Sequence, residues 1–147
     1  MLAVDLDSVD LLARFEGTRV AFPVTSAHGT AALATVWMEL APGGELPEHT
    51  DSAEELLLVL DGEVEATVGG ESGTLCAREL AVVPALAPHG LRNVTDQLAR
   101  VLGVFASSTN VAVFTEPRGA EALRVFVIGA PLPLAAPLEE PEPVAVA

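Results

Sequence analysis

Short strand patterns separated by turn-forming residues run through most of this 147-residue chain. From Thr18 onward, runs rich in Val, Leu and Thr alternate with Gly, Pro, Asn and Asp. Evenly spaced short strands of this kind are typical of an antiparallel sandwich or barrel. The sequence therefore predicts an all-β fold, with strands at 18–25, 31–40, 54–60, 63–68, 72–77, 80–83, 89–94, 99–105, 111–115 and 121–128.

Two of the intervening turns carry specific signals. Asp61-Gly62 separates two strand patterns and is a strong indication of a two-residue hairpin. Gly69-Gly70 offers a second tight turn. Between them, residues 63–68 alternate polar and apolar side chains, as a half-buried strand does.

The two ends of the chain differ from this pattern. Residues 1–17 are expected to form a short irregular or helical N-terminal extension, in which 8–15 could make one or two helical turns ended by Gly17. Residues 18–130 are expected to form the barrel domain. Residues 131–147 are rich in Pro, Ala and Glu, and this composition predicts a frayed acidic tail.

Charge and composition narrow the possible partners. The chain has 21 acidic and 7 basic residues, a formal net charge of −14, and every basic residue is Arg. Such a field repels phosphate backbones and anionic lipid, so no nucleic-acid or membrane partner is expected. The N-terminus lacks a signal-peptide pattern, and no apolar run approaches the roughly 20 residues that span a bilayer. The expected location is cytoplasmic.

The single cysteine, Cys76, excludes an intramolecular disulfide. Its neighbours Leu75 and Ala77 favour a small hydrophobic residue in a strand over a reactive nucleophile.

Two short segments collect the side chains that bind divalent transition metals. His49, Asp51 and Glu55 form one cluster, and His89 follows in a second segment. His49 and Asp51 are two residues apart, so in a strand both point to the same face. Glu55 opens an otherwise apolar run, where an ionised carboxylate needs a cation or hydrogen-bond donors. The prolines at 84 and 88 would hold His89 rigidly.

Each residue also has an ordinary structural explanation. A lone strand histidine is more often a hydrogen-bonded structural residue than a ligand. Glu48, Asp51, Glu54 and Glu55 could form a solvated acidic loop and strand edge. The third histidine, His28, lies in a Ser-Ala-His-Gly turn and is expected to be exposed.

The spacing of the cluster resembles the first motif of the cupin superfamily, in particular its small single-domain conserved-barrel (cupin type-2) members. That motif, G-x5-H-x-H-x3-E-x6-G, maps onto Gly43, His49, Asp51, Glu55 and Gly62 with every interval kept. One ligand position differs from the motif, because Asp51 stands where the usual second histidine would be.

The second motif of that family, G-x5-P-x-G-x2-H-x3-N, maps onto Pro84, His89 and Asn93. Arg78 and Leu86 stand in place of its two glycines.

The resemblance covers about residues 18–116 and implies a cupin β-barrel, also called a double-stranded β-helix or jelly roll. It further implies a metal near the centre of the barrel and commonly a homodimer. The ligands carried over are His49, Glu55 and His89, with Asp51 in place of a histidine. A carboxylate there makes the ligand set harder, which favours Mn, Fe or Zn over Cu and leaves the choice among Mn, Fe, Zn and Ni open.

The resemblance implies a metal-dependent enzyme, similar to a dioxygenase, isomerase or lyase, that acts on a small organic molecule. Glu55 could leave the metal and act as a catalytic base. Apolar lining expected from Leu57 and Val59 suits a neutral or aromatic substrate better than a phosphorylated sugar, and Arg92 is the basic residue beside the motifs. The alternative is a non-catalytic module that binds a small molecule or a metal, with a vestigial metal site.

Overall fold

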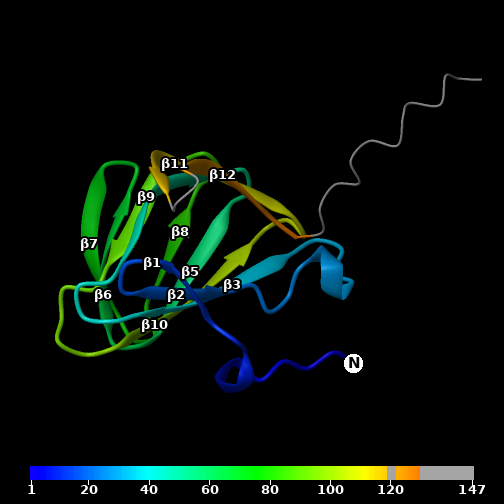
Figure 1. Cartoon of the computed structure of the whole chain (residues 1–147), viewed down its shortest axis with the longest axis horizontal. Helices are drawn as coiled ribbons and strands as arrows, with labels where there is room; N and C mark the ends of the chain where they lie inside the picture. The colour runs from blue at the N-terminus through cyan, green and yellow to red at the C-terminus, as the bar shows by residue number, and fades with distance from the viewer. Residues whose placement is uncertain (119–121, 130–147) are drawn as a thin grey trace, which may run out of the picture.

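Two antiparallel sheets of six strands each face one another in the computed structural model, which describes residues 1–118 and 122–129 (Figure 1). The first sheet has the order β1 (Leu12–Phe15), β2 (Thr18–Ala21), β3 (Ala34–Leu40), β10 (Ala99–Phe105), β5 (Glu55–Asp61) and β8 (Leu80–Val83). The second has the order β12 (Leu123–Ile128), β11 (Asn110–Arg118), β4 (Glu45–Asp51), β9 (His89–Arg92), β6 (Glu63–Val68) and β7 (Glu71–Cys76). The all-β prediction is confirmed.

Two single 3-10 turns, η1 (Leu6–Ser8) and η2 (Ser26–His28), are the helical elements of the described residues. No helix in that part of the chain is long and apolar enough to cross a membrane. The ambiguous segment 8–15 resolves into the end of η1 and strand β1, which pairs with β2 through Leu12 and Val20.

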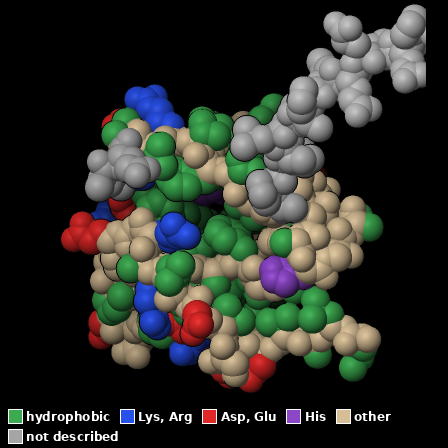
Figure 2. Space-filling model, turned by 45° about the vertical axis from the view of Figure 1, so that its right-hand side comes forward, with side chains coloured by type: hydrophobic (Ala, Val, Ile, Leu, Met, Phe, Trp, Pro, Cys, Tyr) green, Lys and Arg blue, Asp and Glu red, His purple; other side chains and the backbone are tan. Residues whose placement is uncertain are grey.

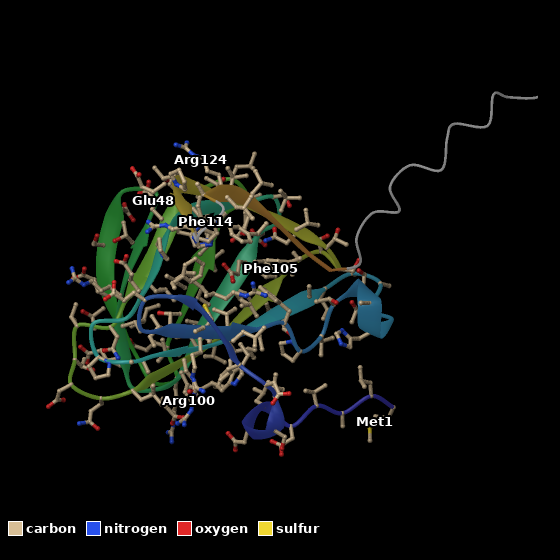
Figure 3. The ribbon with its side chains drawn as sticks, in the orientation of Figure 1. Met1, Glu48, Arg100, Phe105, Phe114 and Arg124 are labelled. Atoms are coloured by element: carbon tan, nitrogen blue, oxygen red, sulfur yellow. The ribbon has the colours of Figure 1, made fainter. Side chains whose placement is uncertain are left out.

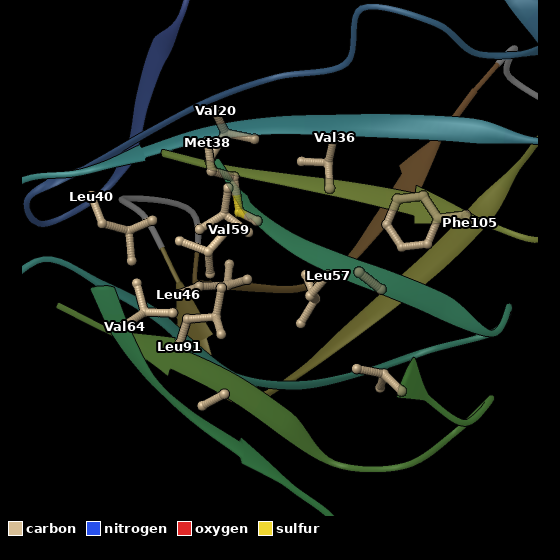
Figure 4. Close-up of a cluster of buried hydrophobic side chains, with 14 of the residues drawn as sticks. Val20, Val36, Met38, Leu40, Leu46, Leu57, Val59, Val64, Leu91 and Phe105 are labelled. Atoms are coloured by element: carbon tan, nitrogen blue, oxygen red, sulfur yellow. The ribbon is translucent and has the colours of Figure 1, made fainter. Parts of the chain in front are cut away.

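The core lies between the sheets and follows from strand alternation. On β5, Leu57 and Val59 point inward and are fully buried, and Val101 of β10 pairs with Val59 (Figure 4). Full burial of one such side chain contributes about 1.5–3 kcal/mol. Residues of the same parity as Leu57 therefore face the barrel interior, and Glu55 is one of them.

The Asp61-Gly62 turn corrects a prediction. β5 and β6 lie in different sheets, so this pair does not close a hairpin. Gly62 has a φ of +76°, and a Cβ there would lie 2.6 Å from the carbonyl oxygen of Leu98. The chain does turn at Asp61-Gly62, but the turn packs against the start of β10 and leads from one sheet to the other.

The Gly69-Gly70 turn joins β6 to β7 as predicted. Val68 pairs with Glu71, and both glycines have positive φ, at 58° and 86°. Two positive-φ residues are what a type I′ hairpin requires.

Two further predictions concern the end regions and Cys76. The predicted last strand is present as β12, whereas the predicted tail at 131–147 lies outside the described residues. Cys76 does end strand β7, but its side chain is exposed rather than buried as a small hydrophobic residue would be.

The outer face of the first sheet carries exposed and half-buried aliphatic side chains. They form two cross-strand rows over β10, β5 and β8, here called the outer aliphatic rows: Val104, Leu56 and Val82 in one row, and Leu102, Leu58 and Leu80 in the other. Leu56 is 42% exposed, Val82 53% and Leu80 54%.

Candidate metal centre

The four residues singled out from the sequence meet inside the barrel. His49 and Asp51 project inward from β4, Glu55 begins β5, and His89 begins β9. Strands β4 and β9 pair with His49 directly opposite His89. All four side chains are buried, with residue exposures between 1% and 5%. The parity argument for His49 and Asp51 is thus confirmed.

The donor atoms of this group converge. Oδ2 of Asp51 lies 3.4 Å from Nε2 of His49 and 3.1 Å from Nε2 of His89. Oε2 of Glu55 lies 3.3 Å from Nε2 of His89. His49, Asp51 and His89 each offer a ligand atom within 4.8 Å of the others, so they could hold a metal ion together. Glu55 stands beside this trio, in contact with His89.

Backbone carbonyls set the orientation of both imidazoles. Nδ1 of His49 lies 2.7 Å from the carbonyl oxygen of Pro47, and Nδ1 of His89 lies 2.9 Å from that of Ala87. A carbonyl oxygen accepts only, so each Nδ1 carries the proton and donates it. In a neutral imidazole this leaves the lone pair on Nε2, directed at the cluster, as metal-binding histidines require.

Asn110 orients the carboxylate of Asp51. Its Nδ2 donates a hydrogen bond of 2.6 Å to Oδ1 of Asp51, while its own oxygen accepts from the backbone N–H of Ala53 and the hydroxyl of Ser52, each at 3.1 Å. Oδ2 of Asp51 is therefore left to face the histidines. Sequence reasoning missed Asn110, because the pairing of β11 with β4 joins residues 59 positions apart.

Gly103 makes room for Glu55. It lies on β10 opposite Leu57, and a Cβ added to it would collide with Oε1 of Glu55 and with the side chain of Val36. The missing side chain is a condition for burying the Glu55 carboxylate at this point. A glycine inside a strand pattern was the available sequence signal.

Burial and the close pairing of opposite charges shift the pKa values of the site. Burial raises the pKa of Glu55, and the charge of Asp51 adds to this effect. Burial also works to raise the pKa of Asp51, but contacts with His49, His89 and Asn110 hold it well below its usual range. For His89, burial opposes the charge, yet Asp51 and Glu55 raise its pKa to about 10. Without a metal, the site therefore retains a proton on His89 at neutral pH.

The residues fit a divalent metal. Among the described residues, Oδ2 of Asp51, Oε2 of Glu55 and Nε2 of His89 are buried and have no hydrogen-bond partner. Their contacts have ion-pair distances without hydrogen-bond geometry. Buried polar atoms without partners carry a free-energy cost, which a shared cation would remove. Two imidazoles and a carboxylate are compatible with Mn, Fe, Zn or Ni.

A cavity of about 690 Å³ adjoins this centre. His49, Asp51 and Glu55 line it, and all five phenylalanines of the chain contribute to its wall: Phe15, Phe22, Phe105, Phe114 and Phe126. Figure 3 shows Phe105 and Phe114 between the sheets, and in Figure 2 hydrophobic side chains surround a hollow in the surface. The centre is therefore reached through an apolar, aromatic space.

Phe114 connects that wall to the metal centre. Its ring stacks on the His49 imidazole, with centroids 4.8 Å apart and an interplanar angle of 24°. Phe15 and Phe126 pack against the Phe114 ring, with centroid distances of 5.2 Å and 5.4 Å. The aromatic wall thus begins at a candidate ligand.

The lining differs from the sequence prediction in two respects. Leu57 and Val59 do not line the cavity, because both are fully buried in the core further along β5. Arg92 is exposed on β9, and the arginines that line the cavity are Arg14 and Arg118. The expected apolar character holds, but phenylalanines supply it.

Fold and site together define a two-sheeted β-barrel protein with a candidate metal centre beside an aromatic cavity. Residues 36–105 match the family model of the cupin domain. The resemblance drawn from the motif spacing is thereby confirmed. At the two motif glycine positions, Arg78 and Leu86 keep positive φ angles of 75° and 65°.

Solved structures support the same fold. The polyketide cyclase RemF from Streptomyces resistomycificus aligns with a TM-score of 0.63 at 22% identity, over 71% of this chain and 78% of that one. A sugar phosphate isomerase of the cupin superfamily from Silicibacter pomeroyi aligns with a TM-score of 0.64 at 18% identity, over 88% and 93%.

Oxalate decarboxylase from Lactobacillus farciminis aligns with a TM-score of 0.68 at 19% identity, over 75% of this chain and 34% of that one. No curated protein matches the chain by sequence. At these identities the likeness concerns the fold.

Proposed function

We propose that this cupin is a metal-dependent enzyme that acts on a small organic molecule held in the phenylalanine-lined cavity. His49, Asp51 and His89 would hold the metal, with Glu55 beside them as a fourth ligand or as a base. The observation that carries the proposal is the set of buried, unpartnered atoms of Asp51, Glu55 and His89 next to a cavity large enough for such a molecule.

A divalent metal bound there would supply Lewis-acid or redox chemistry. The protein's own part is positioning and proton transfer. Glu55 lines the cavity, and burial raises its pKa toward the range of a general base. Asn110 and the carbonyls of Pro47 and Ala87 fix the remaining side chains before any substrate enters. The centre is thus preorganised by the fold.

The relatives of known activity add support of a general kind. They are named a polyketide cyclase, an oxalate decarboxylase and a sugar phosphate isomerase, and each name is that of an enzyme with an organic substrate. The aromatic wall of this cavity suits an apolar substrate better than a sugar phosphate.

Turnover by the metal-loaded protein tests the proposal. Protein stripped with a chelator and then reloaded with Mn, Fe, Zn or Ni is offered catechols, flavonols and small diketones, with oxygen uptake and substrate loss followed. Activity that disappears on stripping and returns with one metal supports the enzyme. Glu55→Gln should lower the turnover number by about 10²-fold or more while metal stays bound, if Glu55 is the base.

A non-catalytic binding module is the second candidate, and one observation favours it. With its pKa raised to about 10, His89 can stand as an imidazolium between Asp51 and Glu55, so the buried charges are partly balanced without a metal. Ligand binding by the stripped and reloaded protein alike, with no turnover of any compound, would favour this module over the enzyme.

We also propose that two copies of the chain associate through the outer aliphatic rows. The rows place six aliphatic side chains on adjacent strands, and β8 is an edge strand of its sheet. Exposed apolar patches of this kind on a soluble protein mark association surfaces. A second copy would present the same face, as a two-fold interface requires.

A further inference from the structure

Arg118 is a basic side chain in the cavity wall that has no counter-ion among the described residues. Its Nε is buried and has no hydrogen-bond partner, and no ion pair involves it within residues 1–118 and 122–129. The absence of a partner is notable in a chain with 21 acidic residues. By contrast, Arg19 and Arg100 both pair with Glu39.

A second arginine, Arg14 of β1, lines the same cavity and is likewise without an ion pair in the described part of the chain. Arg14 is exposed, so its guanidinium can donate hydrogen bonds to water, whereas the Nε of Arg118 is shielded from solvent. In Figure 2 a basic side chain lies close to the apolar hollow. The cavity thus combines apolar walls with positive charge, although the whole chain is strongly acidic.

Arg118 lines the cavity from the end of β11, beyond the residues that pair with the strand of the candidate metal centre. Ala112 pairs with Asp51 and Phe114 pairs with His49. Arg118 follows Phe114 by four residues, and the register of β11 against β12 shifts between Val113 and Arg118, so the cavity lining and not strand parity gives its place. Four residues of strand span up to roughly 14 Å, so a ligand that contacts both Arg118 and the candidate centre has to extend along the aromatic wall.

We propose that the cavity binds an aromatic or similarly apolar carboxylic acid, whose carboxylate pairs with the Arg118 guanidinium. Its apolar body would lie against the phenylalanines, and its far end would face His49, Asp51 and His89. Guanidinium pairs with carboxylate through two parallel hydrogen bonds, and a shielded site strengthens them. This proposal rests on the proposed function for the identity of the reacting end, but the binding of the acid does not require a metal.

The walls between these two ends discriminate against other anions. Apart from the arginines and the candidate metal centre, Thr25 is the polar side chain among the described lining residues. A sugar phosphate would leave its hydroxyl groups without partners, at a cost for each one. Oxalate could contact one end but would leave the aromatic wall empty.

Binding of a matched pair of probes tests this assignment. The probes are 2-naphthoate and its neutral amide, 2-naphthamide, with oxalate as the short acid. Their dissociation constants are measured by calorimetry for the wild-type protein, Arg118→Gln and Arg124→Gln, each metal-free and metal-loaded. Arg124 is the matched control, since it lies on the adjacent strand β12, outside the cavity lining (Figure 3).

Naphthoate should bind the wild-type protein more tightly than naphthamide or oxalate. Arg118→Gln should weaken naphthoate about tenfold or more and leave naphthamide within about twofold, because a charge-assisted hydrogen bond is lost. Arg124→Gln should leave both unchanged. Arg118→Lys, which keeps the charge, should weaken naphthoate binding less than Arg118→Gln does. This variant shows whether the loss in Arg118→Gln comes from the missing charge or from a folding defect.

Equal affinity for the acid and the amide would overturn the inference, as would equal effects of the Arg118 and Arg124 substitutions, or no binding of either naphthalene. These outcomes are separable from failure of the proposed function. Arg118-dependent selectivity in a protein that takes up no metal supports the inference and refutes the metalloenzyme. Metal-dependent turnover without that selectivity supports the metalloenzyme and refutes the inference about Arg118.

Discussion

The side-chain amide of Asn110 holds Asp51 by a hydrogen bond of 2.6 Å, and Asp51 is the residue at which this cupin domain departs from the usual motif. A carboxylate is shorter than an imidazole and has two oxygens that can rotate. Asn110 occupies one of them and leaves the other facing both histidines. Asp51 in β4, the residue that differs from the motif, therefore has a hydrogen-bond donor in Asn110 of β11.

Removing that amide should loosen the metal centre. In Asn110→Ala, Oδ1 of Asp51 loses its donor, which costs about 1–3 kcal/mol of stability and about 10- to 100-fold in metal affinity. Metal titration and urea unfolding measure the two effects. Thr115→Ala on the same strand removes a hydrogen bond to exposed Glu48 and serves as the control. Unchanged metal affinity in Asn110→Ala would mean that Asn110 does not position Asp51.

Gly103→Ala should disturb Glu55 without altering any ionisable group. The new methyl group would overlap the Glu55 carboxylate, and such overpacking costs about 1–3 kcal/mol in unfolding free energy. Gly73→Ala on β7 is the matched control, because a Cβ there meets no atom within 4 Å. Shortening the acid in the double variant Gly103→Ala, Glu55→Asp should recover part of the loss. Equal stabilities of the two glycine variants would refute the close packing of Gly103 against Glu55.

The stability of metal-free protein should fall as pH rises above neutrality. His89 has its pKa raised from 6.5 to about 10, so its contribution is complete below pH 6.5 and is lost as pH rises through about 10. Glu55, whose pKa is also raised, acts in the same direction. Asp51, with a lowered pKa, contributes above about pH 3.8 and loses its contribution on acidification.

Thermal unfolding of chelator-treated protein from pH 4 to pH 10 measures this dependence. Bound metal should replace the His89 proton and so reduce the loss of stability at alkaline pH. His89→Gln should reduce it as well, from a lower starting stability. Metal-free protein whose melting temperature rose steadily from pH 7 to pH 10 would contradict the arrangement of His89 between two carboxylates.

The outer aliphatic rows predict a dimer that one charge should break. Leu56→Lys puts an ammonium group in the central strand of the rows and should shift sedimentation from dimer to monomer. Val94→Lys is the control, because Val94 is also exposed, at 57%, but lies outside the rows. A monomeric wild-type protein at micromolar concentration, or a Leu56→Lys dimer as tight as wild type, would remove this interface.

Local patterns predicted much of the fold and part of the site. The alternation of strand residues placed His49 and Asp51 on one face, because period-two geometry acts over a few residues. The Gly69-Gly70 hairpin was likewise predictable from adjacent residues. The resemblance to the cupin motifs predicted that Glu55 and His89 join His49 and Asp51, and both lie at the same point.

What sequence reasoning missed depends on contacts across sheets. Asn110 and Gly103 contact candidate ligands carried by other strands. Asn110 has no local sequence signal for that role, and the strand pattern around Gly103 does not say which side chain the glycine makes room for. The Asp61-Gly62 pair illustrates the converse, since its local signal was strong but the next strand joined the opposite sheet. Leu57 and Val59 were expected to line the cavity, but an apolar residue on a strand can face either the packed core or the open part of the barrel.

Metal content tests the central claim most directly. Untagged protein, offered Mn, Fe, Ni and Zn in turn and dialysed, is assayed by elemental analysis alongside His49→Ala, His89→Ala and His28→Ala. The exposed His28 lies in η2 and is the matched control among the three histidines. We expect about one ion per chain in wild type and His28→Ala, and near-complete loss in the other two variants. Less than about 0.1 ion per chain in wild type with every metal, or full retention in both ligand variants, would contradict a metal centre at His49, Asp51 and His89.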